Sequence, residues 1–95
     1  MQEIRYGVVG TGMMGIEHIE NLAAVEGATV TAIADPDPGS RDRGMAACSG
    51  RVEVFTDHHA LIDSGLCDAV VVAAPNHTHH RVLLDLLATD LHVLT

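Results

Sequence analysis

The sequence predicts an α/β domain built on a doubly wound parallel sheet with the strand order 3-2-1-4-5. Along its 95 residues, apolar runs of strand length alternate with runs at helical spacing, and the connections between them are short. A glycine-rich turn separates the first strand-like run, residues 4–9, from the first helix-like run, residues 16–24. The most apolar run, residues 68–74, is continuous, as expected of a central parallel strand covered on both faces. Together these observations predict a Rossmann fold, truncated after its fifth strand.

The glycine-rich turn consists of Gly10, Thr11, Gly12, Met13, Met14 and Gly15. Glycine-rich turns serve many loops, but one that follows a strand and opens a helix has the context of a dinucleotide-binding GxGxxG. In such a turn Gly10 allows the tight bend, Gly12 leaves bare backbone for a pyrophosphate, and Gly15 lets helix and strand approach closely. The anion would lie on free N–H groups at the helix start, so the turn needs no lysine, and it contains none.

A second strand is expected at residues 28–34, and it ends in Asp35. Asp35 follows Gly15 by about 20 residues, the spacing at which a carboxylate meets the adenosine ribose. With Asp37 nearby, that carboxylate would repel a 2′-phosphate, so we expect NAD rather than NADP. Arg41 and Arg43 argue for NADP, because an arginine on this loop can pair with the phosphate.

The first helix is expected to turn one face to the sheet, formed by Ile16, Ile19, Leu22 and Ala23. Residues 35–40 contain two prolines and predict a loop, whose last residue, Ser40, caps a short helix over residues 41–48. Gly44 weakens that helix.

Residues 52–55 predict a brief third strand, followed by a helix through residues 58–62 that Thr56 or Asp57 can cap. Neighbouring residues such as His58 and His59 leave a helix in diverging directions. We therefore expect these two histidines to lie on a solvated face and to share no metal.

The loop after the fourth strand carries a second set of candidate cofactor-binding residues, Ala74, Pro75, Asn76 and His79. In the order 3-2-1-4-5 the first and fourth strands are neighbours at the switch point, so this loop opens onto the cofactor crevice, on the nicotinamide side. His77, His79 and His80 would suit a metal, but no carboxylate or cysteine stands at ligand spacing, and we expect none. Asn76 or Thr78 can also cap the fourth helix.

That helix is expected to bury Val82, Leu83, Leu86 and Leu87, and residues 91–95 begin a fifth strand.

The net charge of −8, from 5 basic against 13 acidic residues, would repel nucleic acid and anionic lipid surfaces, and we expect neither as a partner. No apolar run approaches the length of a membrane span. Cys48 and Cys67 form no CxxC and are interpreted as free thiols, with a reactive pair as the lesser alternative. The first residues show no signal-peptide pattern, which predicts a cytoplasmic protein.

The sequence resembles the Gfo/Idh/MocA oxidoreductases over its whole length. Four segments carry the resemblance: Tyr6 to Gly15 with His18, Ala32 to Asp35, Asp68 to Asn76 with His79, and His92 to Thr95. The combination of the glycine turn, the Pro-Asn after the fourth strand and the histidine three residues beyond it is far more specific than any one part.

The resemblance implies that residues 1–95 are an incomplete NAD(P)-binding Rossmann domain, to which the family adds a C-terminal domain that binds substrate and mediates oligomerisation. It also implies hydride transfer between NAD and a sugar, inositol or related polyol, in a homo-oligomer. The family's Glu-Lys-Pro motif, whose lysine helps to position cofactor and substrate, and its Asp-x-x-x-His motif, which supplies the acid/base, would follow Thr95. We therefore expect no catalytic residue within these 95, and no activity from them alone.

Two other functions remain open at this point. A regulatory Rossmann module could sense NAD(H) without turnover, although Pro75 and Asn76 at the nicotinamide end favour the enzyme. A methyltransferase that uses S-adenosylmethionine has a related glycine turn, but would not normally combine the GxGxxG spacing with this Pro-Asn.

Overall fold

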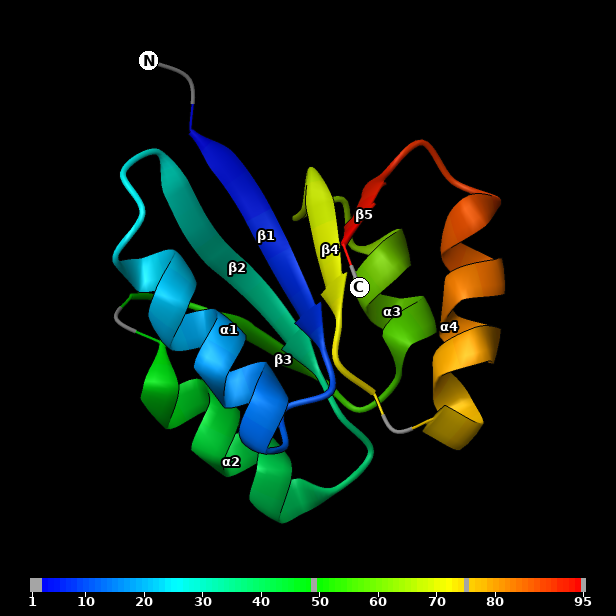
Figure 1. Ribbon diagram of the computed structural model, residues 1–95, viewed down its shortest axis with the longest axis horizontal. Helices are drawn as coiled ribbons and strands as arrows, with labels where there is room; N and C mark the ends of the chain where they lie inside the picture. The colour runs from blue at the N-terminus through cyan, green and yellow to red at the C-terminus, as the bar shows by residue number, and fades with distance from the viewer. Residues whose placement is uncertain (1–2, 49, 75, 95) are drawn as a thin grey trace.

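The structure is a computed structural model that describes residues 3–48, 50–74 and 76–94; for residues 76 and 77 it describes the backbone alone. Its centre is a five-stranded parallel sheet with the order β3-β2-β1-β4-β5, which confirms the predicted fold class and strand order (Figure 1). The strands are β1 (Ile4–Val9), β2 (Ala28–Ala34), β3 (Glu53–Phe55), β4 (Ala69–Val72) and β5 (His92–Leu94). The helices are α1 (Met13–Ala23), α2 (Pro38–Ala47), α3 (His58–Asp63) and α4 (Asn76–Leu87).

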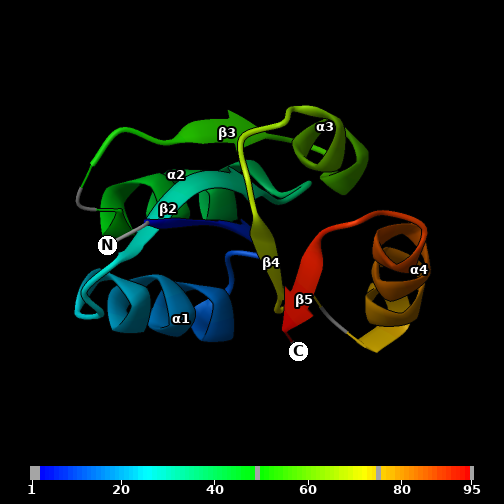
Figure 2. The same ribbon diagram turned by 90° about the horizontal axis from the view of Figure 1, so that it is seen from above.

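The helices cover the sheet in pairs. α1 and α2 lie together on one face, and α3 and α4 lie on the other (Figures 1 and 2). Because a strand's side chains alternate between faces, neighbouring residues of β1 enter different cores. Val8 packs with Ile19 of α1, while Val9 packs with Leu61 of α3 and Leu86 of α4.

All four residues of β4 are buried, as the continuous apolar run predicted. β4 pairs in parallel with β1 on one side and β5 on the other, so its backbone is satisfied along both edges. The carboxyl ends of β1 and β4 therefore lie side by side at the point where the strand order reverses, which is where open α/β sheets bind ligands.

α2 begins three residues earlier than the sequence analysis predicted, and its cap is Asp37 rather than Ser40. The Asp37 carboxylate accepts a hydrogen bond from the Ser40 backbone N–H at 2.9 Å, and Pro38 occupies the first turn. A proline there costs nothing, because its missing N–H would have no helical partner and its fixed φ already suits a helix. Pro38 therefore starts the helix that it was expected to precede, whereas Pro36 lies before the helix as expected.

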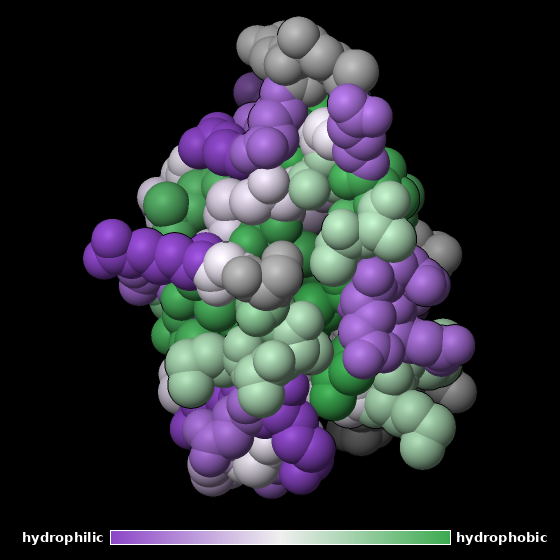
Figure 3. Space-filling model, turned by 90° about the vertical axis from the view of Figure 1, so that its left-hand side faces the viewer, coloured by the Kyte–Doolittle hydropathy of each residue, from purple (hydrophilic) through white to green (hydrophobic). Residues whose placement is uncertain are grey.

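Two predicted apolar faces are narrower than expected. On α4, Val82 and Leu86 are buried but Leu87 is 73% exposed, and on α1 Ala23 is exposed. The side of the molecule on the left of Figure 1 shows apolar surface between polar patches (Figure 3). The exposed large apolar residues of α1 and α2 are Met13, Met14 and Met45. None of the helices in the described part of the chain is both long and apolar enough to cross a membrane.

Candidate functional site

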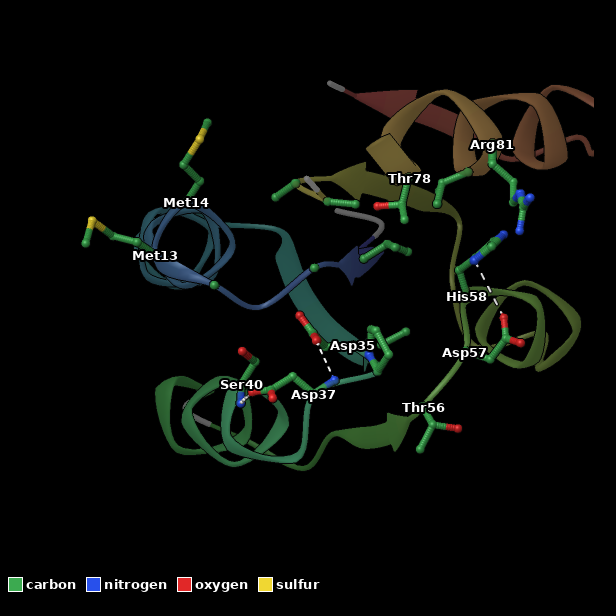
Figure 4. A pocket seen from close by; sticks show the side chains of 18 residues that line it. Met13, Met14, Asp35, Asp37, Ser40, Thr56, Asp57, His58, Thr78 and Arg81 are labelled. Carbon is green, nitrogen blue, oxygen red and sulfur yellow. Dashed lines mark hydrogen bonds and ion pairs between the residues drawn. The ribbon is translucent and has the colours of Figure 1, made fainter. Parts of the chain in front are cut away.

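A cavity of about 930 Å³ lies at the carboxyl ends of the central strands (Figure 4). Its volume falls in the range of small-molecule and cofactor sites. Four connections supply its wall: the glycine turn, the loop after β2, the loop from β3 into α3, and the loop from β4 into α4. The residues that line it include Gly10, Gly12, Met13, Met14, Asp35, Pro36, Asp37, Ser40, Thr56, Asp57, His58, Ala73, Ala74, Thr78 and Arg81.

The glycine turn has the tight packing that its sequence predicts. Gly10 has a φ of +93°, and a Cβ there would lie 2.8 Å from the backbone of Ala73 and Ala74. A Cβ on Gly15 would overlap the carbonyl oxygen of Gly10, so this glycine allows the helix and the strand end to meet. Gly12 differs from both, because a Cβ there would have nothing within 4 Å. Two glycines are thus required by packing, and Gly12 leaves open space on the cavity wall.

The start of α1 faces this cavity without a side chain to cap it. Gly12 is the N-cap residue, and it offers no side-chain hydrogen bond to the first turn. The first backbone N–H groups of a helix have no acceptor within the helix, and the helix dipole adds partial positive charge there. This end of α1 can therefore hold an anion such as a pyrophosphate. Met13 and Met14 extend outward from it and are 86% and 65% exposed (Figure 4).

Asp35 joins the glycine turn to the loop after β2. Its Oδ2 accepts a hydrogen bond from the Thr11 backbone N–H at 2.8 Å, and its Oδ1 accepts one from the Asp37 N–H at 2.8 Å. An ionised carboxylate has about four acceptor positions, so both oxygens retain capacity for a pair of hydroxyls. The carboxylate is thus oriented by two backbone donors at the edge of the cavity, as a ribose-binding group would need.

The two arginines of this loop interact with the protein. Arg41 Nη1 donates to the carbonyl oxygens of Asp35 and Pro36 at 2.9 and 3.0 Å, and Arg43 Nη2 donates to the Ser40 hydroxyl at 3.2 Å. Neither residue lines the cavity. The arrangement favours a cofactor without a 2′-phosphate.

Not every predicted site residue lies on the cavity wall. Thr11 is fully buried, and its hydroxyl donates to the Ser40 carbonyl oxygen at 2.6 Å, so it links the glycine turn to α2. His79 is half-buried on α4 and does not line the cavity. Pro75 lies outside the described residues, and the side chain of Asn76 is not described. Of the two candidates after β4 whose side chains the structure describes, Ala74 lines the cavity and His79 does not.

Sequence reasoning missed the wall formed by Thr56, Asp57 and His58 after β3, and by Thr78 and Arg81 on α4. The available signal was the strand order. In a parallel sheet the carboxyl ends of β2, β3 and β4 share one edge, so the loop after β3 opens toward the same crevice.

The structure also corrects the interpretation of the adjacent histidines, whose rings come together rather than diverge. The ring centroids of His58 and His59 lie 4.1 Å apart, and both rings contact Asp57 of the α3 cap and Asp85 of α4. The His58 side chain is only 13% exposed, so it does not lie on a solvated face. The His59 backbone N–H lowers the pKa of Asp57, and the His58 side chain lowers the pKa of Asp85. The Asp57 hydrogen bond raises the pKa of His59.

Comparison with known proteins identifies the fold and its cofactor. The model of an oxidoreductase family with an NAD-binding Rossmann fold, GFO_IDH_MocA, matches residues 4–95. Inositol 2-dehydrogenase 1 of Saccharopolyspora erythraea is 50% identical over 81 residues, which cover 83% of this chain and 24% of that protein. Inositol 2-dehydrogenase of Leifsonia xyli is 40% identical over 93 residues, or 97% of this chain and 27% of that protein.

Solved structures agree with the sequence matches. The myo-inositol dehydrogenase of Lactobacillus casei, in complex with NAD(H) and myo-inositol, superposes with a TM-score of 0.91 at 30% identity. That superposition covers 97% of this chain and 27% of the solved chain. The chain thus spans about a quarter of the length of the relatives it matches. Since the family model covers nearly all of it, this chain belongs to the Gfo/Idh/MocA oxidoreductase family and has that family's NAD-binding Rossmann fold.

Proposed function

We propose that this chain is the cofactor-binding domain of an NAD-dependent dehydrogenase that moves a hydride between NAD and a polyol such as inositol. The family match and the similarity to two inositol 2-dehydrogenases support this function. NAD supplies the hydride acceptor when bound. The role of this chain is to bind and orient NAD, and the residues that line the cavity fit that role.

The observation that carries the proposal is that an uncapped helix start and an oriented carboxylate face one cavity. The N–H groups at the start of α1 would hold the pyrophosphate beside Gly12, where the wall has no side chain. Asp35 would accept hydrogen bonds from the adenosine ribose hydroxyls. Ala74 at the end of β4, with Pro75, Asn76 and His79 after it, would border the nicotinamide half.

Three further parts of the proposal extend beyond these residues. We infer that a longer protein supplies the acid/base and the substrate-binding surface, because a hydride-transfer enzyme must hold its substrate carbon and move a hydroxyl proton. A homo-oligomer is proposed by family resemblance. A cytoplasmic location is supported by two free thiols, Cys48 and Cys67, which suit a reducing compartment.

The test has a binding arm and a turnover arm. Calorimetric titration should show that the protein binds NADH, binds NADPH more weakly and does not bind S-adenosylmethionine. The longer protein, which includes the proposed substrate-binding part, should then produce NADH from NAD when myo-inositol is added. Binding of S-adenosylmethionine in place of NADH would overturn the proposal, and NADH binding without turnover of any polyol would favour the sensing module.

A further inference from the structure

The pair of histidines at the start of α3 is held by two carboxylates from different elements. Asp57 Oδ1 lies 2.9 Å from His59 Nδ1 and 3.5 Å from His58 Nδ1. On the opposite edge of the rings, Asp85 Oδ2 of α4 lies 2.7 Å from His58 Nε2 and 2.9 Å from His59 Nε2. We propose that Asp57, His58 and His59 form a binding site for a divalent transition-metal ion of the zinc class, and that Asp85 orients its two histidine ligands.

The carboxylates constrain which ring nitrogens carry hydrogens. An ionised carboxylate oxygen can only accept hydrogen bonds, so His58 Nε2, which hydrogen-bonds to Asp85 Oδ2 at 2.7 Å, carries a hydrogen. A neutral imidazole protonated at Nε2 has its lone pair at Nδ1, so the lone pair of His58 lies on the side of Asp57. His59 faces a carboxylate at both ring nitrogens: its Nδ1 is hydrogen-bonded to Asp57 Oδ1, and its Nε2 lies beside Asp85 Oδ2. A metal ion bound at His59 Nδ1 would replace the hydrogen that lies between this atom and Asp57.

Three possible ligand atoms consequently lie close together. One ligand atom from each of Asp57, His58 and His59 lies within 4.8 Å of the others. Acceptors cannot face one another at such distances without a positive charge between them, which either protons on the rings or a metal ion can supply. Zinc bonds of about 2.0–2.2 Å place tetrahedral ligands about 3.3–3.6 Å apart. The Asp57–His58 separation of 3.5 Å already has this value, and the Asp57–His59 separation needs to open by about half an ångström.

The second carboxylate is what distinguishes this cluster from a chance group of surface residues. Histidine ligands of metals almost always donate their other ring N–H to a carboxylate or carbonyl, which sets the tautomer and the ring orientation. Asp85 lies beside the Nε2 atoms of both histidines, in the position of such a carboxylate. It belongs to another helix and follows His58 by 27 residues.

The donor set indicates the kind of metal. Two imidazole nitrogens and one carboxylate oxygen match three-ligand zinc sites, which keep a further position for water. Asp57 and His59 are 58% and 57% exposed, so water can reach that position. Magnesium and calcium prefer oxygen ligands and would bind poorly here. The site does not depend on what fills the neighbouring cavity, although Asp57 and His58 also line that cavity.

The experiment measures metal binding directly, with no cofactor present. After dialysis against EDTA, the protein is titrated calorimetrically with zinc chloride and, separately, with magnesium chloride. We expect one Zn²⁺ per chain and no response to Mg²⁺. Cobalt(II) in place of zinc should give the visible absorption of a four- or five-coordinate site.

Two variants test the ligands and a third tests the orienting carboxylate. A fourth tests the alternative that Zn²⁺ binds to α4 outside the cluster. Asp57→Asn retains an N-cap acceptor for α3 and so keeps the fold, yet it removes the ligand charge. Asp57→Asn and His59→Ala should each weaken Zn²⁺ binding at least about tenfold, and Asp85→Asn should weaken it about 10–100-fold. The matched control is His80→Ala, which removes an exposed histidine of α4 outside the cluster and should leave the affinity unchanged.

The proposal fails if the protein binds no Zn²⁺, because protons then satisfy the cluster. It also fails if Zn²⁺ binding survives in both Asp57→Asn and His59→Ala. Loss of binding in His80→Ala alone would overturn the proposal and assign the metal to α4. Circular dichroism of each variant shows whether the fold is intact, and Asp57→Asn, which keeps the helix cap, decides the outcome if His59→Ala unfolds.

Discussion

The carboxylate of Asp35 accepts the backbone N–H of Thr11 at 2.8 Å, and this hydrogen bond joins the end of β2 to the glycine turn that follows β1. It brings the proposed ribose-binding and pyrophosphate-binding groups into one rigid unit. Because the donor is backbone, no substitution at position 11 other than proline removes it. The position of the Asp35 carboxylate is therefore set by the fold, and its chemistry can be changed alone.

Replacing Asp35 should change cofactor preference. We expect Asp35→Ser to weaken NADH binding about tenfold, because hydrogen bonds from the ribose to a charged acceptor are lost. NADPH binding should change little, so the ratio of the two affinities falls. Calorimetric titration with each cofactor gives that ratio. Asp42→Ser, which removes an exposed carboxylate of α2, is the matched control, and an unchanged ratio in Asp35→Ser would refute the assigned role.

Gly12→Val should abolish NADH binding and leave the fold intact. The backbone of Gly12 has φ −72° and ψ −164°, which any residue can adopt, and a Cβ there has nothing within 4 Å. The branched side chain would occupy the space proposed for the pyrophosphate. Met13→Ala should bind NADH normally, because the Met13 side chain lies at the rim of the cavity and is 86% exposed. If circular dichroism shows that Gly12→Val unfolds the domain, the glycine is structural.

Gly15→Ala should unfold the domain or destabilise it by about 3 kcal/mol or more, because the new Cβ overlaps the Gly10 carbonyl oxygen. The gain in helix propensity, about 1 kcal/mol, is smaller than this steric cost. Urea denaturation measures the difference. Gly50→Ala, where a Cβ has nothing within 4 Å, should be close to neutral. Equal effects at the two positions would contradict the packing described here.

Thr11→Val should reduce stability without weakening cofactor binding by the folded protein. The side chain is fully buried, and its loss would leave the Ser40 carbonyl oxygen without its 2.6 Å hydrogen bond. Losing one such hydrogen bond costs about 0.5–1.5 kcal/mol. Urea denaturation and NADH titration measured on the same variant separate the two effects. A large loss of NADH affinity with stability unchanged would instead assign the hydroxyl to the cofactor.

The stability of the domain should depend on pH through Asp68. Arg5 donates hydrogen bonds to both carboxylate oxygens of Asp68, at 2.9 and 3.2 Å, and lowers the pKa of that carboxyl to about 2. A carboxyl whose pKa is lowered by folding stabilises the protein above its unfolded pKa of about 4 and loses that contribution as the pH falls toward 2. Asp68→Asn should therefore be less stable than the parent at pH 7, and the difference should disappear near pH 2.

Denaturant midpoints of the two proteins between pH 7 and pH 2 follow this change. Asp90→Asn, which neutralises an exposed carboxylate after α4, is the control and should track the parent throughout. A difference between Asp68→Asn and the parent that persists unchanged at pH 2 would show that the ion pair is not its cause.

The strand order and the glycine turn could be predicted because they depend on local signals. Ala69 to Val72 is continuously apolar, and the glycines stand at the fixed spacing of a strand-to-helix turn. The start of α2 was mispredicted because Pro38 is compatible with both a loop and a first helical turn, and the choice depends on Asp37 capping from outside. The roles of Thr11 and Asp85 could not be predicted, because their partners are distant in sequence and meet only when helices pack on the sheet.

The contacts of Arg41 have a consequence for how cofactor preference can evolve. Its guanidinium donates hydrogen bonds to the carbonyl oxygens of Asp35 and Pro36, so this cation is engaged within its own loop. Removing the carboxylate of Asp35 takes away one cofactor's partner without freeing a cation for the other. A protein that evolves from NAD to NADP through position 35 must then pass through variants that bind both cofactors poorly, unless Arg41 is first released from these carbonyl oxygens. Preference for NAD therefore depends on Asp35 and Arg41 together, and a single substitution at position 35 does not convert it.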